Sequence, residues 1–142
     1  MSLRIGEVAQ LTGTTPRTIR YYEELGLLAP ASDREPGAHR VYEDADVEHL
    51  REVLRLRRVL GLSLDELRDL SAEESARAAR KREWDAGVED PVRRRQILEE
   101  AARYADLQLD LLRRRREELD ELERELVAKR RRVRGRLREL VG

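Results

Sequence analysis

The chain has 142 residues, of which 42% are charged and only 4% are aromatic, a composition too polar for one thick core but suited to long helices with solvated faces. The formal net charge is zero, so no overall basic field marks a nucleic-acid binder, and any such contact must depend on local placement. There is no cysteine, which excludes disulfides, thiolate metal sites and thiol redox sensing, and two histidines are poor material for a metal site, so we expect no cofactor.

Two short helices joined by a tight turn are predicted near the N-terminus. Apolar residues recur at helical spacing over residues 5–12, and Gly13 ends that helix. Thr15 has the character of an N-cap, Pro16 of a first helical position and Gly26 of a stop. This is the helix-turn-helix arrangement.

A loop and a third helix follow. Proline and glycine punctuate residues 29–42, and Arg40-Val41-Tyr42 has the character of a short strand, so we expect a small hairpin with Pro36-Gly37 near its tip. Asp44 is the expected cap of a third helix that Gly61 ends.

Two further helices are predicted before the long C-terminal one. The capping-box pattern of Ser63–Glu66 opens a short helix to Leu70. Ser71 repeats the pattern and is expected to open a polar helix to about Trp84, before residues 85–89 interrupt it.

The last element should be one helix from Pro91 to about residue 140, roughly 75 Å long. An apolar residue recurs every seventh position, which favours a coiled coil over a helix lying on its own globular domain. The heptads alone do not distinguish parallel from antiparallel pairing. The expected dimerisation residues are Leu98, Ala105, Leu112, Leu119, Leu126 and Val133, with Leu122 between them.

The second helix carries a cluster of side chains suited to DNA, namely Arg17, Thr18, Arg20 and Tyr21. Arginine binds phosphates and the guanine edge, and tyrosine hydroxyls commonly contact phosphate oxygens. Helical spacing places Arg17, Arg20 and Tyr21 on one face. Taken alone, the segment fits an ordinary amphipathic helix equally well, with Arg20 paired to a nearby glutamate and Tyr22 in the core.

The wider pattern resembles the MerR family of transcriptional regulators. The resemblance covers residues 3–70, through "RIGEVAQLTGTTPRTIRYYEELGLL" and then "HRVYEDADVEHLREVLRLRRVLGLSLDELRDL". It implies a mainly α fold, with a winged helix-turn-helix DNA-binding domain at 1–70. A polar helix and linker at 71–90, a candidate effector region, would precede a coiled-coil dimerisation helix at 91–142.

The resemblance also implies a function and a site. A homodimer would bind double-stranded promoter DNA and distort it so that RNA polymerase can engage. Arg17, Thr18, Arg20 and Tyr21 would contact DNA, Tyr22 would mainly brace the recognition helix, Arg40 and Tyr42 would contact the backbone from the wing, and Arg58 would hold a phosphate. We expect Arg20→Ala to weaken specific binding far more than Arg51→Ala.

The sequence gives less information about an effector than about DNA binding. Metal- and redox-sensing branches of the family use cysteines, which this chain lacks. Trp84 and Tyr104 are candidates for a small aromatic pocket that binds an organic effector at the dimer joint. The favoured alternative is that Trp84 simply anchors the insert by packing.

The sequence bears on two other classes of function. A coiled-coil scaffold or adaptor whose N-terminal domain binds protein stays open, because the net charge is zero and the last helix is long. An enzyme is not supported, since the sequence has no paired acid and base, phosphate-binding glycine loop or metal constellation. No signal peptide or membrane span is predicted, so we expect a cytoplasmic protein, nucleoid-associated when bound to DNA.

Overall fold

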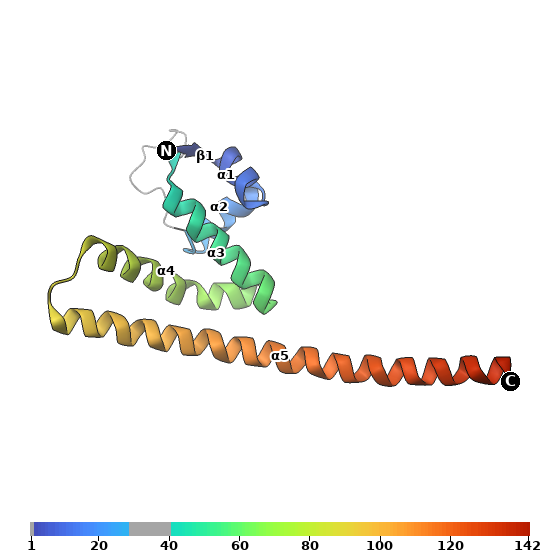
Figure 1. The fold of residues 1–142 in the computed structure, drawn as a ribbon. Coiled ribbons are helices and arrows are strands. Elements are labelled where there is room, and N and C mark those ends of the chain that lie inside the picture. Colours follow the sequence, from blue (N-terminus) through green and yellow to red (C-terminus); the bar gives the residue numbers. More distant parts are fainter. Residues whose placement is uncertain (1, 29–40) are drawn as a thin grey trace. The chain divides into compact units, whose positions relative to one another are not determined.

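A computed structural model describes residues 2–28 and 41–142, and its fold is mainly α (Figure 1). The chain divides into two compact units, one up to Tyr104 and one from Ala105 to the C-terminus. The elements are β1 (Leu3–Arg4), α1 (Ile5–Thr12), α2 (Pro16–Glu24), β2 (Val41–Tyr42), α3 (Asp44–Leu60), α4 (Leu64–Ala86) and α5 (Pro91–Val141).

The helix-turn-helix prediction is confirmed by α1 and α2. Gly13 has a φ of 69°, in the left-handed region where glycine is favoured, and ends α1. The Thr14 amide then donates to the Ala9 carbonyl at 3.0 Å. Thr15 caps α2, because its hydroxyl accepts from the Thr18 amide at 3.2 Å. Local turn chemistry therefore fixes where both helices end and begin.

The small sheet pairs β2 with the start of the chain. Leu3 is opposite Tyr42 and Arg4 is opposite Val41, in an antiparallel pair. The predicted strand is confirmed at residues 41–42, while the predicted hairpin tip lies outside the described residues. The partner strand was missed, because a two-residue strand is too short to show an alternating pattern.

The core of the first unit is built from one face of each short helix. Ile19 and Tyr22 of α2 and Val53 of α3 have no exposed surface. Val8 of α1 and Leu50 of α3 are each 1% exposed and complete this core. Truncating such a residue to alanine typically costs about 2–5 kcal/mol, so the back of α2 is firmly held.

The predicted start of α3 was one residue late. Glu43 is the N-cap, and its amide donates to the carboxylate of Asp46 at 2.8 Å. Asp44 and Asp46 both lie in the first turn, where the helix dipole favours negative charge. Gly61, with a φ of 63°, ends the helix as expected. These two acidic side chains therefore stabilise the start of α3.

The predicted break at Ser71 is wrong, since α4 is one continuous helix of 23 residues. Its start is as expected, with the Glu66 amide donating to the Ser63 hydroxyl at 3.1 Å. Buried Leu67, Leu70 and Glu74 continue one face at helical spacing through the repeated capping pattern. Such a pattern marks a helix start only where the preceding residues are not already helical. The expected domain boundary after residue 70 thus falls inside a helix.

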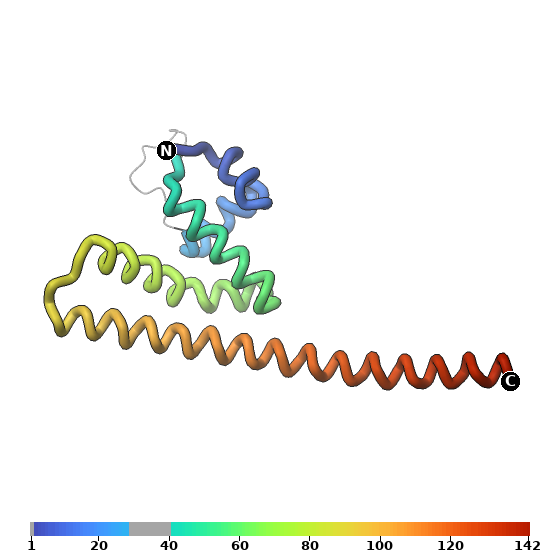
Figure 2. Tube along the Cα trace, in the orientation of Figure 1, coloured from blue at the N-terminus to red at the C-terminus, as the bar shows by residue number. Residues whose placement is uncertain are grey.

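The long helix is confirmed as α5, with 51 residues and a length of about 75 Å. Its first turns run antiparallel to α4 (Figure 2). Ile97 and Tyr104 are buried, and the Tyr104 hydroxyl donates to Glu74 of α4. Each of the two residues lies one position before an expected dimerisation residue. The first part of α5 thus carries two seven-residue stripes, one packed within the chain and one exposed.

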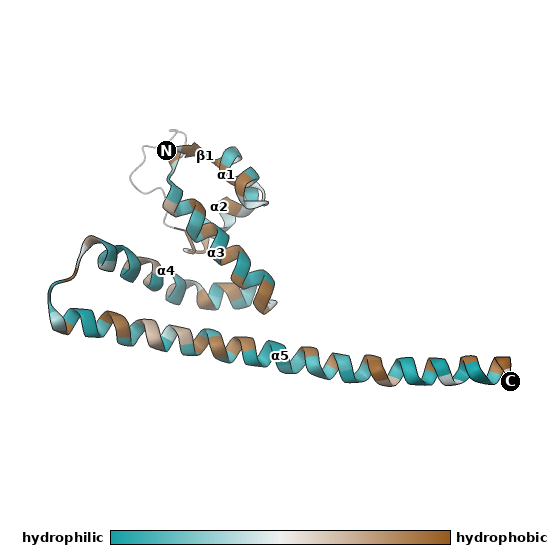
Figure 3. Cartoon of the chain, in the orientation of Figure 1, coloured by the Kyte–Doolittle hydropathy of each residue, from teal (hydrophilic) through white to brown (hydrophobic). Residues whose placement is uncertain are grey.

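The second unit is the remainder of α5 alone. Hydrophobic residues recur along it between hydrophilic stretches (Figure 3). The expected dimerisation leucines of this unit are exposed, from 36% for Leu112 to 53% for Leu126, and Val133 is 48% exposed. A row of half-exposed leucines along a helix is typical of a surface that another helix covers.

Candidate nucleic-acid interface

The outer side of α2 forms what we call the recognition face, which consists of Arg17, Thr18, Arg20 and Tyr21. The two arginines are exposed, and the other two side chains are partly exposed. The Thr18 hydroxyl lies 3.0 Å from that of Thr15, so it takes part in the helix cap. The predicted sharing of one face by the arginines and Tyr21 agrees with this exposure pattern.

Neither arginine of this face is neutralised within the described part of the chain. The structure shows no ion pair for Arg17 or Arg20 there, including the alternative pairing of Arg20 with a neighbouring glutamate. Glu23 is instead 8% exposed, on the buried side of the helix. Two exposed guanidinium groups without a protein carboxylate are suited to bind phosphate oxygens or a guanine edge.

Tyr22 is buried, whereas Arg17 and Arg20 of the recognition face are exposed. Its ring is fully buried, and its hydroxyl accepts a hydrogen bond from Nη1 of Arg57 at 3.1 Å. This position fits the bracing role expected for Tyr22, which stays a prediction. Arg57 was missed from the sequence, because an arginine near a helix end usually appears as a solvated side chain.

Glu23 and Tyr42 form a second brace between α2 and β2. The Tyr42 hydroxyl donates to Oε1 of Glu23 at 2.5 Å, and Tyr42 is 5% exposed. The expected contact of Tyr42 with DNA does not fit this placement, since its ring and hydroxyl face the protein. Arg40, the other expected wing contact, lies outside the described residues.

Two arginines of α3 differ in their surroundings. Arg58, expected to hold a phosphate, is exposed near the end of the helix. Arg51 donates from Nη2 to the carbonyl of Leu11 at 3.2 Å and so caps the last turn of α1. Replacing Arg51 would therefore disturb the helix-turn-helix itself, whereas Arg58 points to solvent.

Comparison with known proteins identifies the family. Residues 3–74 match the MerR HTH family regulatory protein profile. The chain is 40% identical over 110 residues to the HTH-type transcriptional regulator YfmP of Bacillus subtilis, covering 78% of this chain and 77% of YfmP. The chain belongs to the MerR family. It is therefore a DNA-binding transcriptional regulator of the MerR type, and the scaffold alternative is not favoured.

The chain also matches other MerR proteins, over different shares of its length. The transcriptional activator TipA of Streptomyces coelicolor is 45% identical over 67 residues, which cover 47% of this chain and 26% of TipA. A solved structure of HiNmlR, a MerR family regulator lacking the sensor domain and bound to promoter DNA, has a TM-score of 0.46 at 22% identity. That alignment covers 92% of both chains.

The two candidate effector residues of this MerR chain are not brought together. The Arg94 guanidinium lies over the Trp84 ring, 5.2 Å from its centroid. Tyr104 is ten residues beyond Arg94, about 15 Å along α5, and its hydroxyl donates to Glu74. The expected shared aromatic pocket is therefore not formed within one chain.

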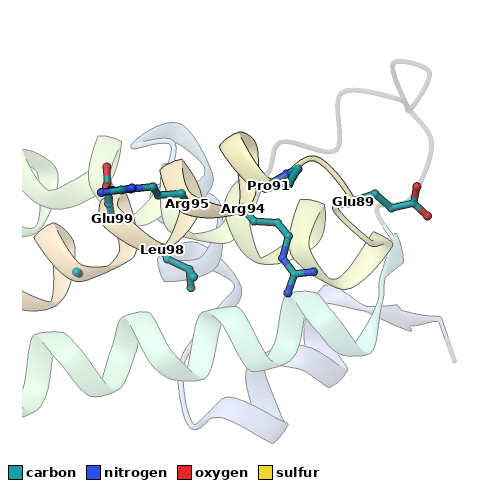
Figure 4. A pocket seen from close by; sticks show the side chains of 7 residues that line it. Glu89, Pro91, Arg94, Arg95, Leu98 and Glu99 are labelled. Carbon is teal, nitrogen blue, oxygen red and sulfur yellow. The ribbon is translucent and has the colours of Figure 1, made fainter.

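An open depression lies on the first turns of α5 (Figure 4). Arg94 and Leu98 are one helical turn apart and lie along the same side of the helix. Neither Trp84 nor Tyr104 lines the depression, whose lining consists of Glu89, Pro91, Arg94, Arg95, Leu98, Glu99 and Ala102. The depression includes Leu98, so it belongs to the exposed heptad stripe.

Within residues 2–28 and 41–142, no three acidic or histidine side chains are grouped closely enough to hold a metal ion. In the same ranges, no helix has the length and apolar character needed to cross a bilayer.

Proposed function

We propose that this MerR protein is a homodimer that binds double-stranded promoter DNA and distorts it so that RNA polymerase can engage. The observation that carries the proposal is the recognition face, with Arg17 and Arg20 exposed on a helix whose back is locked in the core. A helix that presents exposed guanidinium groups on a rigid support suits entry into the major groove.

The exposed heptad stripe of α5 supports the dimer. A single chain leaves Leu119, Leu122 and Leu126 about half exposed. Pairing two copies along α5 would remove this apolar surface from water, which is favourable by about 25 cal/mol per Å². Two copies would also present two recognition faces, as a palindromic operator requires.

Any effector contact is proposed at Trp84 alone. Trp84 is 37% exposed, whereas Tyr104 is 4% exposed and its hydroxyl is occupied. A thiolate-bound metal is excluded as an effector because the chain has no cysteine. Titrating a panel of small organic metabolites while following tryptophan fluorescence tests this site, and an unchanged signal across the panel would count against it.

Distortion and dimerisation are tested together on one DNA. A duplex selected by the protein from randomised DNA carries a donor dye at one end and an acceptor at the other. We expect two chains per duplex by light scattering and a change in energy transfer on binding. One chain per duplex, or binding with unchanged energy transfer, would contradict the proposal. Free dye-labelled duplex and a scrambled duplex are the controls.

A further inference from the structure

A chain of hydrogen bonds connects the segment after α2 with the start of α5. Nε2 of His49 donates to the Leu27 carbonyl, so Nδ1 is free to accept from Nη2 of Arg77 at 3.1 Å. Arg77 donates from Nε to one oxygen of Glu74 at 2.8 Å, and Tyr104 donates its hydroxyl hydrogen to the other. We call these four side chains, from His49 to Tyr104, the α2–α5 relay.

A second bond holds the same segment. The Ser75 hydroxyl donates to the Gly26 carbonyl at 2.5 Å. Gly26 and Leu27 directly follow the last turn of α2. The end of the recognition helix is therefore attached to α4 by Ser75 and, through His49, by the relay.

Burial of Glu74 makes its carboxylate dependent on the hydrogen bonds of the relay. Glu74 is 2% exposed, so its carboxylate depends on the donors of Arg77 and Tyr104 for the solvation that water would give. The Nδ1 atom of His49 lies 3.6 Å from the same carboxylate. Removing one partner leaves a buried charge poorly compensated, which favours rearrangement of the helices over a passive loss of one bond.

The hydrogen bonds of the relay are directional, which apolar packing is not. Ile97 of α5 is 4% exposed, but apolar burial is non-directional and tolerates small shifts. Hydrogen bonds to both oxygens of Glu74 have narrow distance and angle requirements. They therefore favour one arrangement of α4, the start of α5 and the segment after α2.

We propose that the relay and Ser75 are positioning residues that set how the recognition helix sits relative to the start of α5. The inference rests on the proposed dimeric function. In a dimer joined through α5, this orientation determines the separation of the two recognition faces. It thereby determines which spacing of operator half-sites the dimer accepts, without any contact between the relay and DNA.

The test compares affinity across spacer lengths. The probe is a duplex that the wild-type protein selects from randomised DNA, with derivatives lengthened or shortened by one or two base pairs at the centre. Tyr104→Phe removes one relay donor and keeps the ring, and Ser75→Ala removes the other attachment. The matched control is Arg93→Gln, which breaks a different contact between α4 and α5, the pair of Arg93 with Glu83 at 2.6 Å.

We expect the wild-type protein to bind DNA of one spacer length more tightly than the others. Tyr104→Phe should reduce this ratio of affinities by at least about fivefold, the low end of the usual coupling between two sites. Ser75→Ala should reduce it in the same direction, and Arg93→Gln should leave it unchanged. A loss of affinity by the same factor at every spacing would indicate a merely structural role and overturn the inference. A wild-type protein indifferent to spacing would instead overturn the proposed dimeric function.

Discussion

The guanidinium of Arg57 donates a hydrogen bond to the hydroxyl of Tyr22 at 3.1 Å, across the boundary between α3 and α2. Tyr22 has no exposed surface, while Tyr21 beside it is partly exposed on the recognition face. The two adjacent tyrosines therefore have different surroundings. Tyr22 is held in the core behind the recognition helix, whereas Tyr21 lies on the partly exposed side.

Phenylalanine at these two positions should separate stability from DNA binding. Tyr22→Phe removes the acceptor of a bond from a charged donor, so we expect a loss of about 1–3 kcal/mol in the free energy of unfolding. Tyr21→Phe should change that free energy by less than about 0.5 kcal/mol but weaken DNA binding. Urea denaturation and DNA titration of both variants measure this, and equal destabilisation by the two changes would contradict it.

The environment of Tyr104 predicts a loss of stability at alkaline pH. Burial, together with the hydrogen bond to the Glu74 carboxylate, raises the pKa of the Tyr104 phenol above its ordinary value of about 10. A raised folded pKa means that this stability is fully present below the unfolded pKa and is lost as pH rises above it. The stability difference between the wild type and Tyr104→Phe should therefore narrow above about pH 10, by at most about 1.4 kcal/mol per pH unit. Urea denaturation at several pH values checks this, and a constant difference would argue against it.

The ion pair of Arg93 and Glu83, between α5 and α4, predicts a loss of stability at acidic pH. The hydrogen bond from Arg93 lowers the pKa of the Glu83 carboxyl. A lowered folded pKa gives stability above the unfolded pKa of glutamate, about 4.3, which is lost as pH falls through the folded value. Carbon NMR of the Glu83 carboxyl should show its pKa rising in Arg93→Gln. An unchanged titration in that variant would mean that the pair does not form in solution.

The proposed dimer depends on the exposed leucines of α5. Leu126→Asp places a charge in the heptad stripe, so we expect it to shift the protein from dimer to monomer in sedimentation experiments. Arg124→Asp introduces the same residue at an outward heptad position and is the matched control. Dissociation by both changes, or by neither, would contradict the assigned stripe.

Local signals in the sequence were enough to predict most of the fold. Thr15, Gly13 and Gly61 mark helix ends through cap and left-handed geometry, which depend only on neighbouring residues. The break at Ser71 was wrong because a capping pattern can also occur inside a helix. The recognition face was predicted from helical spacing, and its exposure depends on which side of α2 the core covers.

The buried polar contacts could not be predicted in the same way. Glu74 and His49 are distant in sequence and lie on helices that are rich in charge. Nothing local distinguishes a carboxylate buried against Tyr104 from one that faces water. The same holds for Tyr42, which was expected to contact the DNA backbone from the wing and whose hydroxyl donates to Glu23. Such pairings are fixed by tertiary packing, which neither periodicity nor spacing encodes.

The most direct test of the central claim is the anisotropy of labelled DNA, selected and scrambled, titrated with protein over a salt series. Arg20→Ala is compared with Arg55→Ala, a cleaner control than Arg51→Ala because Arg55 is exposed and, among residues 2–28 and 41–142, pairs with Glu52 of its own helix alone. We predict tight, selective, salt-steep binding that Arg20→Ala weakens strongly and Arg55→Ala leaves nearly unchanged. Equal losses for the two variants, or equal binding to selected and scrambled DNA, would contradict the account.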